Sequence, residues 1–262
     1  MGPHGPLIAL FSFDFNLKLC YIFTMKHLVS INDLSLSEIE DIYELSSELK
    51  QNPLNKLLKD KSIAMIFEKP SNRTRVSFEV GIYELGGNAI SLQDNEIQLG
   101  KRESIADAAK TLSRYVDAIV IRTFDHKNIV EFANNSTVPV INALSDFSHP
   151  CQALADIFTI QEKWKDIKGL KFVFVGDGNN VARSLNLLCK KTGINFVLSC
   201  PKKFEIEDTN IEYNPYDAVK NADVIYTDVW TSMGQEKESK KRKKIFSKYQ
   251  VNSKLINLAN KH

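Results

Sequence analysis

The sequence predicts an α/β protein with two αβ domains, each built on a parallel sheet, joined by a helix and with an active-site cleft between them. Two observations support this. Short apolar runs alternate with helical patterns along the chain, which is typical of parallel sheets covered by helices. The alternation pauses at one long helical pattern, residues 149–164, and then restarts. We therefore expect domains at 25–148 and 165–262, sizes that suit single domains.

The first half of the chain predicts strands that alternate with helices. Its first helix begins at Ser35 or Ser37, which are favourable N-cap residues, and stops at Asn52-Pro53. The apolar runs predict strands at 62–67, 89–92, 118–122 and 138–142, and the patterns between them predict helices at 75–85, 104–115 and 129–133.

The second half repeats this plan, with strands expected at 171–175, 194–198 and 224–227 and a helix at 179–191. The basic run 240–244 is interpreted as the solvated face of a helix rather than a nuclear-import or nucleic-acid-binding patch. Polar segments follow the strand ends at 68–74, 122–126, 145–152, 176–180 and 228–234. Because ligands bind beyond the carboxyl ends of parallel strands, we expect the functional residues in these segments.

The composition is that of an ordinary globular protein. The chain has 262 residues, 34 Lys and Arg against 32 Asp and Glu, and 43% hydrophobic residues. These values exclude a disordered chain and a disulfide scaffold, and they give no overall positive field for a nucleic-acid partner. The four cysteines are Cys20, Cys151, Cys189 and Cys200, and no two of them form a CxxC pair. We therefore expect reduced thiols, a cytoplasmic location and no structural metal.

No uncharged apolar stretch reaches the ~18 residues that a membrane span needs, so no membrane partner is expected. Residues 1–24 are apolar and aromatic, but Asp14 and Lys18 interrupt them and they contain no arginine. They resemble neither a secretory signal nor a mitochondrial transit peptide. Because a more conventional sequence opens at Met25, we interpret 1–24 as an N-terminal extension of unknown role.

The first candidate site lies between a predicted strand and a predicted helix, where hydroxyl, amide and guanidinium groups follow one another: Ser71, Asn72, Arg73, Thr74 and Arg75. Free N–H groups at a helix N-terminus attract a phosphate dianion, and an arginine can bind two of its oxygens. Simple capping of the helix by Ser71 or Thr74 is the equally weighted alternative for this segment alone.

Two further segments carry groups that can bind an anion or polarise a carbonyl. Arg122 ends an apolar strand, where it would face a ligand or else reach solvent. His149 and Gln152 lie three residues apart at the start of the joining helix, so both can face one side of its first turn. A structural capping role is the alternative for His149.

The second half offers two more segments. Gly176-Asp177-Gly178 follows a strand and opens a helix, like a dinucleotide-binding turn, but Val181 stands at the third glycine position and no acidic residue ends the next strand. The alternative is a sharp turn that presents Asn180 to a substrate. Asp228 follows the strand at 224–227 and could hold a substrate ammonium; a surface loop anchored by a packed tryptophan is the alternative.

Taken together, the order and spacing of these segments resemble the aspartate/ornithine carbamoyltransferase family, over about Met25 to His262. Segment 71–75 resembles the family's Ser-Thr-Arg-Thr-Arg carbamoyl-phosphate motif, and Gln98, Arg122 and the run 149–152 (His-Pro-Cys-Gln) continue it. The pattern Asp-x-Trp-x-Ser-Met-Gly at 228–234 points to the ornithine branch of the family.

The resemblance implies attack of the ornithine side-chain amine on the carbonyl carbon of carbamoyl phosphate, with no metal or redox cofactor, in a homotrimer. It implies that Arg122 and His149 are the catalytic residues. The carbamoyl-phosphate ligands would be Ser71, Asn72, Arg73, Thr74, Gln98, Arg122, His149 and Gln152. The ornithine ligands would be Asn180, Asp228, Ser232 and Met233.

Two departures from the family pattern stand out. Asn72 replaces the family's threonine, which should retune phosphate binding rather than abolish it. The family also continues with a His-Cys-Leu-Pro motif and a closing helix, which this sequence lacks, so we expect a C-terminally truncated member. Alternatives are a related carbamoyltransferase that uses putrescine or acetylated ornithine, an inactive truncated remnant, and an NAD-type oxidoreductase.

Overall fold

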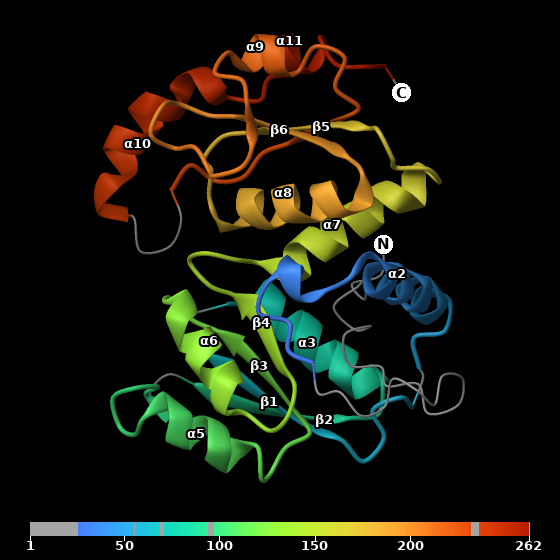
Figure 1. Ribbon diagram of the computed structural model, residues 1–262, viewed down its shortest axis with the longest axis vertical. Helices are drawn as coiled ribbons and strands as arrows, with labels where there is room; N and C mark the ends of the chain where they lie inside the picture. Colours follow the sequence, from blue (N-terminus) through green and yellow to red (C-terminus); the bar gives the residue numbers. More distant parts are fainter. Residues whose placement is uncertain (1–25, 55, 69–70, 94–96, 232–235, 262) are drawn as a thin grey trace. The chain divides into compact units, whose positions relative to one another are not determined.

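The computed structural model describes residues 26–54, 56–68, 71–93, 97–231 and 236–261. The chain divides into two compact units, 1–159 and 160–262, and the division falls within helix α7 (Pro150–Lys163). Each unit contains a four-stranded sheet whose paired strands are all parallel. The predicted α/β class with two parallel sheets is therefore confirmed (Figure 1).

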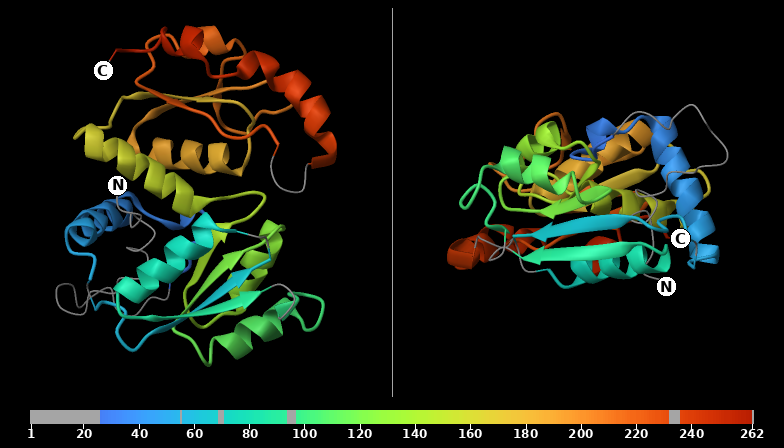
Figure 2. Two further views of the ribbon diagram at one scale, coloured as in Figure 1. Left: turned by 180° about the vertical axis from the view of Figure 1, so that it is seen from behind. Right: turned by 90° about the horizontal axis from the view of Figure 1, so that it is seen from below.

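The sheet of the first unit has the strand order β2-β1-β3-β4. Its strands are β1 (Ser62–Phe67), β2 (Asn88–Gln93), β3 (Ala118–Arg122) and β4 (Val140–Leu144). Its helices are η1 (Ile31–Asp33), α2 (Leu36–Gln51), α3 (Arg73–Glu84), α5 (Ile105–Leu112) and α6 (His126–Asn135), followed by the start of α7. The two views in Figure 2, together with Figure 1, show α3 on the opposite face of this sheet from α5 and α6.

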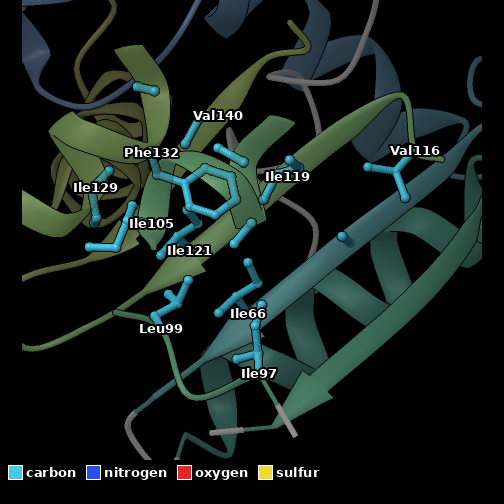
Figure 3. Packing of buried hydrophobic residues seen from close by; sticks show 14 residues of the cluster. Ile66, Ile97, Leu99, Ile105, Val116, Ile119, Ile121, Ile129, Phe132 and Val140 are labelled. Atoms are coloured by element: carbon cyan, nitrogen blue, oxygen red, sulfur yellow. The ribbon is translucent and has the colours of Figure 1, made fainter. Parts of the chain in front are cut away.

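The core of the first unit follows from the two-residue period of its strands. Ala64 and Ile66 of β1 point to the same face as Ile119 and Ile121 of β3, and the residues between them point to the other face. On the first face they pack against Phe132 of α6 and against the apolar side of α5, as Figure 3 shows. The central strands β1 and β3 are covered on both faces, which explains their uninterrupted apolar sequences.

The sheet of the second unit has the order β7-β6-β5-β8. Its strands are β5 (Lys171–Val175), β6 (Asn195–Ser199), β7 (Asn210–Ile211) and β8 (Val224–Tyr226). Its helices are α8 (Asn180–Thr192), α9 (Pro215–Ala218), η2 (Glu236–Glu238), α10 (Ser239–Phe246), η3 (Ser247–Tyr249) and α11 (Ser253–Ile256). The side chain of Asn179 caps the start of α8, and Gly193 ends it with a positive φ of 76°.

Most of the predicted elements are present, with their ends moved by one to three residues at several places, and β1, β3 and β5 have the predicted bounds. The prediction did not contain β7, α9 and α11, which have only two to four residues each. The predicted extension 1–24 lies outside the described residues. No helix in the described part of the chain has the length and apolar character needed to cross a membrane.

Candidate active site

In the first unit, backbone hydrogen bonds hold the carboxyl ends of three strands side by side. The N–H of Glu68, just after β1, donates to the carbonyl of Arg122 at 2.9 Å. The N–H of Thr123, just after β3, donates to the carbonyl of Leu144 at 3.1 Å. The hydroxyl of Thr123 also donates to the carboxylate of Glu68. The parallel register therefore brings Arg122 close to the segment that leads from β1 into α3.

The first turn of α3 is open to an acceptor from outside the helix. Asn72 occupies the N-cap position, but its side chain makes no capping hydrogen bond. Thr74 is the second residue of α3 rather than its N-cap, and its hydroxyl oxygen accepts a hydrogen bond from Nη1 of Arg122 at 2.9 Å. Ser71 lies half-buried directly before this turn. Capping by the N-cap side chain therefore does not account for this segment, and anion binding by it stays a prediction.

Arg122 is a buried cation with a second cation nearby. Arg122 is only 7% exposed. Burial, together with the positive charge of Arg73, lowers the pKa of its guanidinium. Its Nε is buried and has no hydrogen-bond partner among the residues that the structure describes. Two guanidinium groups at the N-terminus of a helix create a strongly positive site, which a bound anion would neutralise.

His149 directly precedes α7, is buried, and interacts electrostatically with Arg122. Burial and then the positive charge of Arg122 lower the pKa of His149 to about 3. The imidazole is therefore neutral at physiological pH, and a neutral imidazole can still donate one hydrogen bond to a carbonyl oxygen. The neighbouring Cys151 is buried, and its thiol pKa is raised to about 12, so it is not a nucleophile at physiological pH.

Two more residues of the first unit were predicted to bind carbamoyl phosphate, and they lie in different surroundings. Gln152 lies on the first turn of α7 with its Nε2 donating to Oδ1 of Asp156 at 2.9 Å, which fixes the direction of its amide. Gln98 is exposed, with a positive φ of 43°, in the loop between β2 and α5. Within the described residues no hydrogen bond joins Gln98 to Arg122 or His149, so the structure does not add it to their group.

In the second unit, the ends of β5 and β8 bring the predicted ornithine ligands Asn180 and Asp228 to the same sheet edge. Asn179 connects them: its Oδ1 accepts from the N–H of Val181, and its Nδ2 donates to Oδ2 of Asp228 at 2.9 Å. Sequence reasoning missed Asn179 as the residue that orients Asp228, although its place just before α8 was a signal for a cap. Ser232 and Met233 lie outside the described residues.

A close backbone contact within the chain explains why position 178 is a glycine, without dinucleotide binding. A Cβ added to Gly178 would lie 2.2 Å from the carbonyl oxygen of Phe204, to which the Gly178 N–H donates at 3.0 Å. In a dinucleotide-binding turn the corresponding glycine lets the backbone approach a pyrophosphate. Here the chain's own Phe204 carbonyl occupies that space, which argues against the oxidoreductase alternative.

The prediction that the basic run 240–244 is a solvated helix face is wrong at one residue. Its four lysines are exposed on α10, as predicted, but Arg242 is buried and forms an ion pair with Asp177. The hydrogen bond from Arg242 to Asp177 spans 65 positions of the chain, so no local pattern could reveal it. Among the described residues no group of three or more His, Cys, Asp or Glu side chains is arranged to hold a metal ion.

Fold and site together define an α/β protein with a group of guanidinium, hydroxyl and imidazole side chains in its first unit and a carboxylate-centred group in its second. The comparisons agree with this division. Residues 26–162 match the aspartate/ornithine carbamoyltransferase carbamoyl-phosphate-binding domain, and residues 168–262 match the aspartate/ornithine-binding domain of the same family. The chain belongs to the aspartate/ornithine carbamoyltransferase family, which confirms the resemblance seen in the sequence.

Several curated relatives are close. The chain is 47% identical over 250 residues to an ornithine carbamoyltransferase of Bacillus subtilis, covering 89% of this chain and 78% of the relative. It is 48% identical over 251 residues to the anabolic ornithine carbamoyltransferase of Pyrococcus furiosus, covering 88% and 80%. The solved structure of the Pyrococcus furiosus ornithine carbamoyltransferase matches with a TM-score of 0.86 and 46% identity, covering 90% of this chain and 82% of that one.

The lowered pKa of His149 predicts how acid affects stability. An unfolded imidazole takes up its proton near pH 6.5, whereas the folded His149 stays neutral down to about pH 3. Between these values the unfolded state binds more protons, so the free energy of unfolding decreases as the pH falls. From pH 7 to pH 5 this one residue should account for a loss of about 2 kcal/mol. Denaturant unfolding of wild type and His149→Asn at both pH values measures it; equal losses in the two proteins would contradict the assignment.

Proposed function

We propose that this protein transfers the carbamoyl group of carbamoyl phosphate to the side-chain amine of L-ornithine, giving L-citrulline and phosphate. The observation that carries the proposal is the buried Arg122 bound to Thr74 at the open N-terminus of α3, with Arg73 nearby. It occurs in a chain whose two parts match both domains of the family. The relatives named above are ornithine carbamoyltransferases, which favours ornithine over putrescine, acetylated ornithine or aspartate as acceptor.

The first unit would bind carbamoyl phosphate. Its phosphate would accept hydrogen bonds from the first-turn N–H groups of α3 and from the side chains of Ser71, Asn72, Arg73 and Thr74. Asn72 suits this role in place of threonine, because its amide is not used as a cap. Gln98 would contact the substrate from its exposed loop.

Arg122, His149 and Gln152 would act on the carbamoyl carbonyl. In the transition state negative charge develops on this oxygen and on the departing phosphate, so fixed donors at both points lower the barrier. A neutral His149 donates without needing a proton from solvent, and the hydrogen bond to Asp156 keeps the Gln152 amide in one orientation. Arg122 would reach both the carbonyl and the phosphate.

The second unit would bind ornithine. Asp228, oriented by Asn179, would pair with the α-ammonium, and Asn180 would bind the α-carboxylate, with Ser232 and Met233 completing the site. The C–N bond forms as the bond between the carbonyl carbon and the phosphate oxygen breaks. The amine loses its proton, which the leaving phosphate can accept, so the reaction requires no separate protein base.

We also propose the coarser features that accompany this activity. Residues 25–148 would form the carbamoyl-phosphate-binding domain, 149–164 the connecting helix and 165–262 the ornithine-binding domain. The active form would be a homotrimer in the cytoplasm. The buried free thiols of Cys151, Cys189 and Cys200 suit a reducing compartment.

A citrulline assay with the purified chain tests the proposal directly. The wild type should form citrulline from carbamoyl phosphate and ornithine, and not carbamoylated products from putrescine or acetylated ornithine. Arg122→Ala should lower kcat by a hundred- to a thousandfold, because one preorganised donor is worth about 2.7–4 kcal/mol. Arg114→Ala, which removes an exposed arginine of the same unit, is the control and should keep the wild-type rate. No citrulline from the wild type, or a fully active Arg122→Ala variant, would refute the proposal.

Asp228→Asn should separate the two substrates. It removes a negative charge from the ornithine group but leaves the first unit unchanged, so the Kd for ornithine should rise about tenfold or more while that for carbamoyl phosphate stays within error. Isothermal titration of each ligand measures this. Asp217→Asn, which removes an exposed carboxylate paired with Lys220, serves as control. Equal weakening of both ligands by Asp228→Asn would show that Asp228 has another role.

A further inference from the structure

Arg242 is the one buried member of the basic run 240–244, and the proposed reaction gives it no role. Its side chain is 7% exposed although it lies between lysines that face solvent. Its Nη2 donates to Oδ2 of Asp177, and its Nε donates to the carbonyl of Trp230. A cation removed from water this completely is stable only when its donors are satisfied, and the Asp177 carboxylate and the Trp230 carbonyl accept from two of its nitrogens.

The same guanidinium also lies close to two aromatic rings. Its Cζ lies 5.1 Å from the ring centre of Phe204 and 5.3 Å from that of Phe246, within the range of cation–π attraction. Phe204 in turn contacts the turn after β5, because its carbonyl accepts from the Gly178 N–H. Arg242 therefore connects the loop after β6 to the same turn that carries Asp177.

These contacts join segments that surround Asp228. The turn 176–179 holds Asp228 through the amide of Asn179, and the Trp230 carbonyl lies two residues beyond Asp228 in the chain. Arg242 thus ties the strand-end segment that contains Asp228 to helix α10 on one side and to the turn after β5 on the other.

The charge of Arg242 also matters for Asp228. Burial raises the pKa of Asp177, the positive charge of Arg242 opposes this rise, and the negative charge of Asp228 adds to it. The two carboxylates therefore interact, and both would attract a cation if both were free. Ion pairing with Arg242 neutralises Asp177, which leaves Asp228 as the carboxylate of this pair that can bind a substrate ammonium.

We propose that Arg242 is a positioning residue for the second substrate: it fixes the segment 228–230 against the turn 176–179 and neutralises Asp177, so that a single, oriented carboxylate meets the ammonium of the amino-acid substrate. This inference rests on the proposed function and extends it to a residue that would not touch the substrate. Arginine suits the position better than lysine, because its guanidinium donates to both acceptors from different nitrogens of one rigid group.

The test is a kinetic comparison of variants of the 262-residue chain. Arg242→Lys keeps the charge, Arg242→Met keeps much of the volume, and Asp177→Asn removes the ion pair while leaving the Trp230 hydrogen bond available. Both Arg242 variants should raise the KM for ornithine about tenfold or more, as expected for the loss of hydrogen bonds from a charged group. The KM for carbamoyl phosphate should change less than about twofold. Asp177→Asn should give an intermediate rise.

Lys241→Met, which alters the exposed neighbour of Arg242, is the matched control and should leave both KM values unchanged. If Arg242→Met does not fold, Arg242→Lys and Asp177→Asn still decide the question. An equal change in both KM values, or a loss of active protein with unchanged ornithine KM, would mean that Arg242 only stabilises the fold and would overturn the inference. A wild type that forms no citrulline would instead overturn the proposed function, and this inference with it.

Discussion

The burial of the Arg122 guanidinium at the end of β3 is the constraint on which the candidate site depends. A cation removed from water needs partners, and here the Thr74 hydroxyl supplies one while Arg73 adds repulsion instead of compensation. The open first turn of α3 and the neutral His149 complete a group that is rich in donors and positive charge. A bound anion would stabilise such a group, which supports the proposal that it binds a phosphate.

The candidate site of the second unit has the opposite charge, because it is centred on carboxylates. Under the proposed function it would present negative charge to a cationic amino group, and two of its carboxylates lie close enough to interact. The ion pair with Arg242 neutralises Asp177, and the Asn179 amide orients Asp228. Under the proposed function, the same parallel architecture would serve an anion in one unit and an ammonium in the other, and the difference would come from the side chains that follow the strands.

The sequence predicted those parts of the molecule whose causes are local. The strands 62–67, 118–122 and 171–175 were predicted with their actual bounds, because strands covered on both faces are continuously apolar. Arg122 was predicted as a site residue because it ends an apolar strand, where ligands of parallel sheets bind, and the structure shows that it is buried rather than in solvent. Family membership was predicted from the motifs and confirmed by the comparisons. The burial of Arg242 could not be predicted, because its partner Asp177 lies 65 positions away and the lysines around it are exposed. The individual roles of the site residues stay predictions.

Thermal unfolding of the 262-residue chain with and without carbamoyl phosphate tests the central claim most directly, because it asks only whether the Arg122 group binds its anion. Ligand at ~100 times its Kd should stabilise the folded state by about 2.7 kcal/mol. In a protein of this size this raises Tm by several degrees. A cooperative transition whose Tm does not respond to carbamoyl phosphate would contradict the assignment of Arg122, Thr74 and the start of α3 as its binding site.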